Sequence, residues 1–248
     1  MGVIYTIWLR NMKRYLRSRS RIIGSLGMPL FFLLILGFGL NSVVTGPHMG
    51  RGYVAFIVPG IVSMTVLFTS MFAGIQIIWD KQFGFLKETL VAPVPRLQIM
   101  AGRTLGGATV AMIQGALVLI VCVFAGFRPS VSAVPLALLF MALIAIVFSA
   151  LGTAIGSTLR DMQGFQLIMN FLIMPIFFLS GALFPLANLP TPLMVATRLD
   201  PLSYGVDGLR GAFIGLANIG VALDVVVLGV LATAFVMLGA WAFSKIQV

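Results

Sequence analysis

The chain has 248 residues, of which 60% are hydrophobic and only 9% are charged, and its formal net charge is +10. Soluble domains carry roughly 25% charged residues, so a water-soluble fold of this size could not cover so much apolar surface. The composition therefore excludes a soluble domain and indicates an integral membrane protein. The positive charge does not predict a nucleic-acid partner, because the basic residues flank apolar stretches and no aromatic-basic groove pattern accompanies them.

Residues 1–21 predict an amphipathic helix ahead of the first span. One face is basic and carries Arg10, Arg14, Arg17 and Arg21. Another face is apolar and carries Tyr5, Trp8, Leu9, Met12 and Leu16. Such a helix lies in the plane of the membrane, with its cations on anionic lipid headgroups. The alternative is that these basic residues serve only as a topology signal.

Six charge-free stretches are each long enough for one membrane-spanning helix, which needs about 20 apolar residues. The expected spans lie near residues 22–44, 54–79, 104–126, 135–158, 165–184 and 222–244. Pro185, Pro190 and Pro192 follow the fifth span, and proline ends helices. We therefore expect a single transmembrane domain over residues 1–248, with short external helices in the segment 185–212.

The distribution of Lys and Arg predicts the orientation of the chain. If the N-terminus is inside, twelve of the 16 Lys and Arg residues fall on the inner side. The outer side then holds only Arg51, Arg128, Arg198 and Arg210. We therefore expect a multi-pass protein of the plasma membrane with both termini in the cytoplasm.

The cytoplasmic loop at residues 80–96 mixes charged and apolar side chains. Asp80, Lys81 and Gln82 open it, and Pro93 and Pro95 end it. The pattern predicts a short amphipathic helix, whose apolar side chains are Phe83, Phe85, Leu86 and Leu90. Such a helix must bury its apolar face against either the bilayer surface or a partner protein.

Two spans carry candidate side chains for a substrate path. One face of the second span holds Thr65, Phe68, Thr69, Phe72 and Gln76, and the fifth span holds Asn170, Met174, Phe177 and Phe178. A wall rich in aromatic side chains and Met suits a large apolar or amphipathic molecule. The alternative is ordinary packing between neighbouring helices.

Two further patterns concern packing and the external segment. Gly102 with Gly106, and Gly152 with Gly156, are small-xxx-small patterns that allow helices to approach closely, either within the chain or at a dimer seam. In the external segment, Asp207 and Arg210 are spaced i, i+3, with Arg198 and Asp200 nearby. These four residues are expected to pair locally and to order an external cap.

Three stretches resemble the permease subunits of type-two ABC exporters, in particular the daunorubicin-resistance-like branch. They are YVAFIVPGIVSMTVLFTSMFAGIQIIWD (53–80), WDKQFGFLKETLVAPVPR (79–96) and FFLSGALFPLANLPTPLMVATRLDPLSYGVDGLRG (177–211). The resemblance covers roughly residues 50 to 216, and the two ends match only in hydropathy. It implies a half-transporter that pairs with a second membrane subunit, identical or related, and with two separate ATPase subunits.

The resemblance also assigns roles to segments. It implies that the 80–96 loop is a coupling helix docked on the ATPase, with contacts from Asp80, Lys81, Gln82, Phe83, Gly84, Phe85, Leu86, Lys87 and Glu88. It implies that the second and fifth spans line the subunit interface through which substrate passes, and that the segment 185–212 caps the pathway.

The chain has no phosphate loop of the form G-x-x-x-x-G-K-[ST], so ATP and magnesium are expected on the partner ATPase and not on this chain. His48 and Cys122 are the only residues of their kinds, and neither a catalytic group nor a metal site is expected. We therefore expect a non-enzymatic exporter subunit for a hydrophobic or amphipathic substrate (drug-like, lipid or glycolipid), surrounded by membrane lipids. The alternative is a structural or channel-like membrane protein without ATP coupling.

Overall fold

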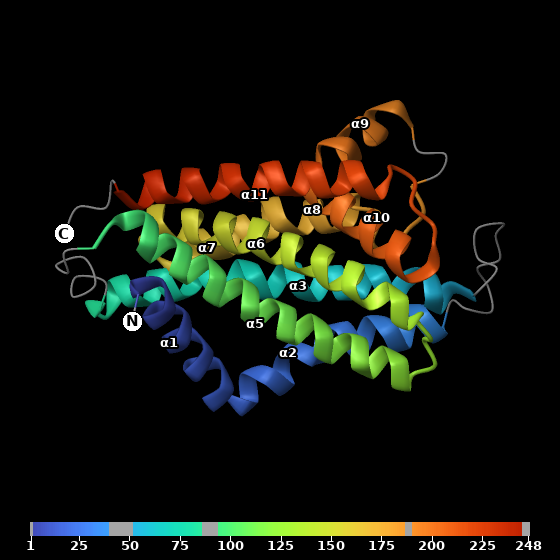
Figure 1. Cartoon of the computed structure of the whole chain (residues 1–248), viewed down its shortest axis with the longest axis horizontal. Coiled ribbons are helices and arrows are strands. Elements are labelled where there is room, and N and C mark those ends of the chain that lie inside the picture. The colour runs from blue at the N-terminus through green and yellow to red at the C-terminus, as the bar shows by residue number, and fades with distance from the viewer. Residues whose placement is uncertain (1, 40–51, 86–93, 187–189, 245–248) are drawn as a thin grey trace.

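The structure is a computed structural model that describes residues 2–39, 52–85, 94–186 and 190–244, and all regular elements in these ranges are helical. Five of the described helices are long and apolar enough to cross a membrane, and a bent N-terminal pair counted as one span makes six. Figure 1 shows the long helices lying side by side in a bundle. An all-α membrane fold with five to six spans is thus confirmed.

The N-terminal region forms two helices that meet at a bend. α1 (Val3–Arg17) is followed by α2 (Arg19–Phe32), and a π-helical segment, η1 (Leu33–Phe38), continues α2. The helical directions on either side of the bend differ by 73°. In Figure 1, α1 lies beside the first part of α5 (Arg96–Phe124), and α2 turns away in a different direction. The separate first helix agrees with the expected segment 1–21, whereas its placement in the membrane plane stays a prediction.

Close packing of α1 on α5 depends on two glycines. A Cβ atom added to Gly102 would lie 3.0 Å from Cβ of Ile7, and one added to Gly106 would collide with Asn11. Ile7 and Asn11 are buried in this contact. The first small-residue pattern thus packs two helices of the same chain.

The second glycine pattern joins α3 (Gly52–Gln82) to α6 (Val134–Thr158). A Cβ atom on Gly152 would lie 2.7 Å from the carbonyl oxygen of Met71, and one on Gly156 would overlap the backbone of Gly74. The two helix backbones are therefore in direct contact, and larger residues here would force them apart. This pattern also serves intrachain packing.

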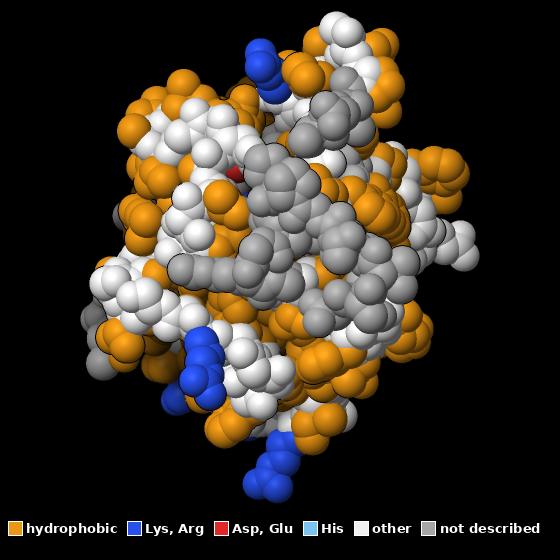
Figure 2. Space-filling view, turned by 90° about the vertical axis from the view of Figure 1, so that its right-hand side faces the viewer, with side chains coloured by type: hydrophobic (Ala, Val, Ile, Leu, Met, Phe, Trp, Pro, Cys, Tyr) orange, Lys and Arg blue, Asp and Glu red, His pale blue; other side chains and the backbone are white. Residues whose placement is uncertain are grey.

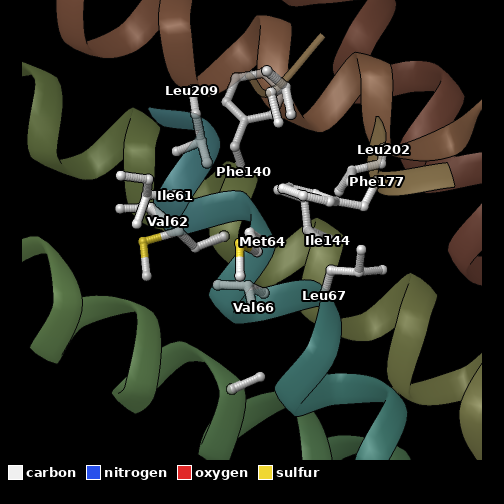
Figure 3. Packing of buried hydrophobic residues seen from close by; sticks show 14 of the residues in the cluster. Ile61, Val62, Met64, Val66, Leu67, Phe140, Ile144, Phe177, Leu202 and Leu209 are labelled. Carbon is white, nitrogen blue, oxygen red and sulfur yellow. The ribbon is translucent and has the colours of Figure 1, made fainter. Parts of the chain in front are cut away.

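α3 forms the centre of the hydrophobic core, and 78% of its most apolar window is buried. Figure 3 shows its side chains beside those of α6, α8 (Met174–Leu179) and α10 (Pro201–Ile214). The labelled side chains are all buried: Ile61, Val62, Met64, Val66, Leu67, Phe140, Ile144, Phe177, Leu202 and Leu209.

The fifth span is made of three consecutive pieces. α7 (Met162–Ile168) and α8 are joined by the π-helical segment η3 (Met169–Ile173). Pro175 follows this segment, and proline cannot donate the backbone hydrogen bond that a regular helix requires. The span ends at Leu179 instead of near residue 184, because Gly181 adopts a left-handed conformation with φ of 75° and turns the chain.

Two short helices precede the last span, as expected for the segment 185–212. α9 (Thr191–Leu199) projects from the bundle in Figure 1, whereas α10 is buried against α3, α6 and α11 (Val221–Ser244). Figure 2 shows this end of the molecule, where hydrophobic side chains surround the rim and basic side chains stand at only a few points. Such a rim is compatible with lipid around the bundle.

Candidate functional site

A cavity of about 870 Å³ lies among α1, α2, α3 and the α7–α8 span. Its size is within the range of small-molecule sites, about 300–1,000 Å³. Eight of the nine predicted path residues line it: Thr65, Phe68, Thr69, Phe72, Gln76, Met174, Phe177 and Phe178. The ninth, Asn170, is exposed and is not among the lining residues. The structure therefore brings together residues from two distant stretches of sequence.

Aromatic side chains and Met dominate the wall of this cavity. Phe177 is only 2% exposed and lies at the centre of the aromatic group. Its ring centroid is 5.9 Å from that of Phe68 and 5.3 Å from that of Phe178. Thr65 adds little polarity, because its hydroxyl donates a hydrogen bond of 2.8 Å to the carbonyl of Ile61. The wall therefore favours an apolar body of substantial width.

The end of α3 nearest the coupling loop holds a buried ion cluster. The carboxylate of Asp80 accepts a hydrogen bond of 2.7 Å from Arg103 of α5 and one of 3.2 Å from Arg10 of α1. Arg14 of α1 is a third cation, 3.8 Å from the other carboxylate oxygen. Asp80 and Arg103 are each 3% exposed. Asp80 therefore ties three helices together.

This cluster corrects the expected role of Asp80 as a contact to the ATPase. Its carboxylate is enclosed within the chain, where it is the counter-charge of the buried Arg103. α5 begins at Arg96, earlier than the expected residue 104, and therefore includes Arg103. Lys81 is also engaged internally. Its Nζ donates to the carbonyls of Gly156, Ser157 and Leu159 at the end of α6. A cation at a helix C-terminus is favourably placed.

The next residues of the loop point outward. α3 continues through Gln82, so the expected separate helix does not begin at residue 80. Gly84 then breaks the helix with φ of 78°. Phe83 and Phe85 are 71% and 53% exposed, a high exposure for aromatic side chains at a helix end. Leu86, Lys87 and Glu88 lie outside the described residues.

Three of the four expected cap residues, Asp200, Asp207 and Arg210, are buried, and no ion pair joins any of the four in the described part of the chain. Asp207 accepts hydrogen bonds from the backbone N–H groups of Asn218 and Ile219. Arg210 is buried and donates a hydrogen bond of 2.9 Å to the carbonyl of Gly181, and its guanidinium carbon lies 4.0 Å from the ring centroid of Phe56. No Asp207–Arg210 ion pair forms among the described residues, since Asp207 accepts from backbone N–H groups and Arg210 contacts a backbone carbonyl and an aromatic ring instead.

Asp200 and Arg198 stand where α9 meets α10. Asp200 caps α10 by accepting a hydrogen bond of 2.8 Å from the N–H of Leu202. Arg198 is exposed, and its carbonyl accepts a hydrogen bond from the hydroxyl of Tyr204. Burial raises the pKa of Asp200 to about 7, even though the N–H of Leu202 and the hydroxyl of Ser203 act in the opposite direction. Burial likewise lowers the pKa of Arg210 to about 10, against the attraction of Asp207.

The raised pKa of Asp200 predicts a pH-dependent stability. Between about pH 4 and 7, the folded protein keeps a proton on this carboxyl that the unfolded chain releases. The free energy of unfolding therefore decreases as the pH rises through this window. Asp200→Asn keeps the helix cap and removes the ionisation. Thermal unfolding in detergent should show the variant gaining on the wild type as the pH rises from 5 to 8. A melting-temperature difference that does not change with pH would contradict this assignment.

Several contributors to the site have no clear signal in the sequence, among them Arg103, Arg14 and Trp79. In the sequence, Arg103 is only a basic residue that flanks the charge-free stretch beginning at Thr104. In the structure it lies within α5, which begins at Arg96. Arg14 and Trp79 line the cavity beside the predicted path residues. For Trp79 the one hint is that it follows Phe72 and Gln76 at helical spacing on α3.

Known proteins resemble this chain along most of its length. The family model described as ABC-2 type transporter matches residues 2–214. The inner membrane transport permease YadH of Escherichia coli (strain K12) is 29% identical over 241 residues, covering 94% of this chain and 91% of that protein. Nodulation protein J of Rhizobium leguminosarum bv. trifolii is 30% identical over 212 residues, covering 84% and 80% of the two chains. The chain, with its bundle of apolar spans, belongs to the ABC-2 type transporter family.

Proposed function

We propose that this protein is the membrane-spanning permease subunit of an ABC exporter in the plasma membrane. In this role it carries a hydrophobic or amphipathic substrate outward through the cavity among α1, α2, α3 and α7–α8. Separate ATPase subunits, two per complex, bind ATP and magnesium and supply the energy. A second permease subunit, identical or related, completes the path, and both termini face the cytoplasm.

One observation carries the proposal: a single helix connects the cavity to the exposed aromatic residues of the loop. α3 supplies Phe68 and Phe72 to the cavity wall and ends at the segment that bears Phe83 and Phe85. The Asp80 and Lys81 contacts hold this end of α3 against α1, α5 and α6. A force applied at the loop therefore reaches the cavity through one continuous element. The inner-membrane transport role in the name of YadH supports the assignment.

The test is a Phe83→Ala/Phe85→Ala variant of the tagged permease. Aromatic anchors in an interface typically contribute about 2 kcal/mol or more each, so the variant should lose most of the co-purifying ABC ATPase subunit and its vanadate-sensitive ATP hydrolysis. Phe124→Ala is a matched control, because Phe124 is 88% exposed at the opposite end of α5.

Membrane insertion should be normal in both variants, as judged by extraction and gel filtration. Unchanged association and ATP hydrolysis in the loop variant would mean that Phe83 and Phe85 rest on the lipid surface. That result would remove the loop as the ATPase contact, whereas the absence of any co-purifying ATPase with the wild-type permease would favour a structural or channel-like protein without ATP coupling.

A further inference from the structure

The wall of the cavity contains one charged side chain among the described residues, Arg14. It stands on the last turn of α1, next to Ser18 at the bend into α2, with Trp79 of α3 also in the lining. The aromatic side chains Phe68, Phe72, Phe177 and Phe178 form much of the remaining wall. The cavity therefore combines a cation with a long apolar surface.

Arg14 has spare hydrogen-bonding capacity. Its nearest acid, Asp80, is 3.8 Å away, beyond hydrogen-bonding distance, and no hydrogen bond joins Arg14 to another described residue. Asp80 is already occupied by Arg103 at 2.7 Å and Arg10 at 3.2 Å. The side chain of Arg14 is 43% exposed, so its guanidinium can reach a molecule in the cavity. A guanidinium presents five N–H donors and no acceptor, in a fork that fits carboxylates and phosphates.

The cluster around Asp80 carries an excess of positive charge. Three guanidinium groups, from Arg10, Arg14 and Arg103, face this one carboxylate. Nε of Arg10 and Nε of Arg103 are buried and have no hydrogen-bond partner among the described residues. No acidic side chain lines the cavity in the described part of the chain. An anion entering at Arg14 therefore meets an excess of positive charge, whereas a cation would be repelled.

The shape of the cavity adds a second requirement. Lining residues on α3 run from Met64 to Trp79, which corresponds to a length of roughly 22 Å at about 1.5 Å per helical residue. A small free anion would leave this apolar length unfilled. A single molecule that uses both features needs a charged head beside Arg14 and a long apolar body along Phe68 and Phe72.

We propose that the cavity selects amphiphiles with an anionic headgroup, a phosphate or carboxylate, which Arg14 binds while the Phe and Met wall holds the apolar body. This inference rests on the proposed function and narrows its substrate class. Arg14 thereby becomes a specificity-determining residue of the export path.

The test uses Trp79 as a reporter, because it lines the cavity. The chain has three Trp residues, so Trp8→Phe/Trp241→Phe leaves Trp79 alone. The purified permease in neutral detergent is titrated with a brominated-chain alkyl phosphate, which quenches nearby tryptophan fluorescence. The matched probe is an alkyltrimethylammonium with the same brominated chain. The phosphate should reach half-maximal quenching at a concentration about tenfold lower, as expected for a charge-assisted hydrogen bond.

Arg14→Gln should abolish this preference, and Arg14→Lys should retain part of it. Arg17→Gln is the matched control, since Arg17 lies on the same helix and is exposed but does not line the cavity. It should leave the preference intact. Inorganic phosphate at the same concentration should displace none of the alkyl phosphate.

Five results would overturn the inference, and the first is a preference that survives in Arg14→Gln. Equal quenching by both probes would show a cavity without charge selection, and displacement by inorganic phosphate would show a free-anion site. An equal loss of preference in Arg17→Gln would show a general surface-charge effect. Absence of quenching by either probe would remove the cavity as an amphiphile site. The proposed function is judged separately, since the loop variant tests ATPase association without any substrate.

Discussion

Asp80→Ala is expected to lower the free energy of unfolding by about 3–5 kcal/mol, the range for removing one partner of a buried ion pair. The variant leaves Arg103, which is 3% exposed, without its counter-charge, and it releases α1 from the end of α3. Thermal unfolding in detergent, followed by the loss of a monodisperse gel-filtration peak, would measure the effect.

The double variant Asp80→Ala/Arg103→Met provides the internal control. Removing both charges should restore much of the lost stability, because no uncompensated ion remains in the core. Asp161→Ala is the matched acid, since Asp161 is an exposed cap at the start of α7 and accepts a hydrogen bond from the N–H of Gly164. Its loss should cost only about 0.5–2 kcal/mol. A similar, small effect in both single variants would contradict a buried cluster at Asp80.

Gly24→Trp is expected to block the cavity and reduce export to about a tenth of the wild-type rate or less, because the indole occupies space that the substrate needs. Gly24 lines the cavity, and a Cβ atom added there would meet nothing within 4 Å, so the substitution should not strain the helix. Gly27→Trp is the matched control, because Gly27 is equally open on α2 but does not line the cavity.

The blockage can be measured without knowing the substrate. Cys122 is the single cysteine of the chain, so Cys122→Ala/Thr69→Cys places one thiol in the cavity wall. Gly24→Trp should slow the reaction of this thiol with a small maleimide about tenfold, and Gly27→Trp should leave the rate unchanged. Equal labelling rates in the two Trp variants would show that Gly24 does not border the same space as Thr69.

Hydropathy and helical spacing were sufficient to predict the all-α membrane fold and the part of the cavity wall that α3 and α8 supply. Phe68 and Phe72 share one face of the second span, Phe177 and Phe178 lie together on the fifth, and the family resemblance implied that these two spans line the path. Asn170 lies in η3 and does not line the cavity, and a π-helical turn leaves no clear mark in the pattern of apolar residues, so helical spacing alone does not place its side chain.

The electrostatic part of the site was beyond sequence reasoning. Asp80 and Arg103 are separated by 23 positions, and nothing in their spacing shows that α3 and α5 meet at those points. The same holds for Lys81, whose acceptors are backbone carbonyls and therefore have no signature in the sequence. The expected pairing among the cap residues is absent for a related reason, since Asp207 binds backbone N–H groups eleven and twelve positions away.

The glycine contact between α3 and α6 has a mechanical consequence. Backbones that touch at Gly74, Gly152 and Gly156, with Lys81 fastened to the end of α6, cannot slide or separate without breaking many contacts at once. We therefore expect α3 and α6 to move together as one rigid unit. The other helices around the cavity include π-helical segments: η1 continues α2, and η3 joins α7 to α8. Regular helical hydrogen bonding is already interrupted in these segments. We therefore expect changes in the width of the cavity to come from bending at η1 and η3, while α3 keeps its shape.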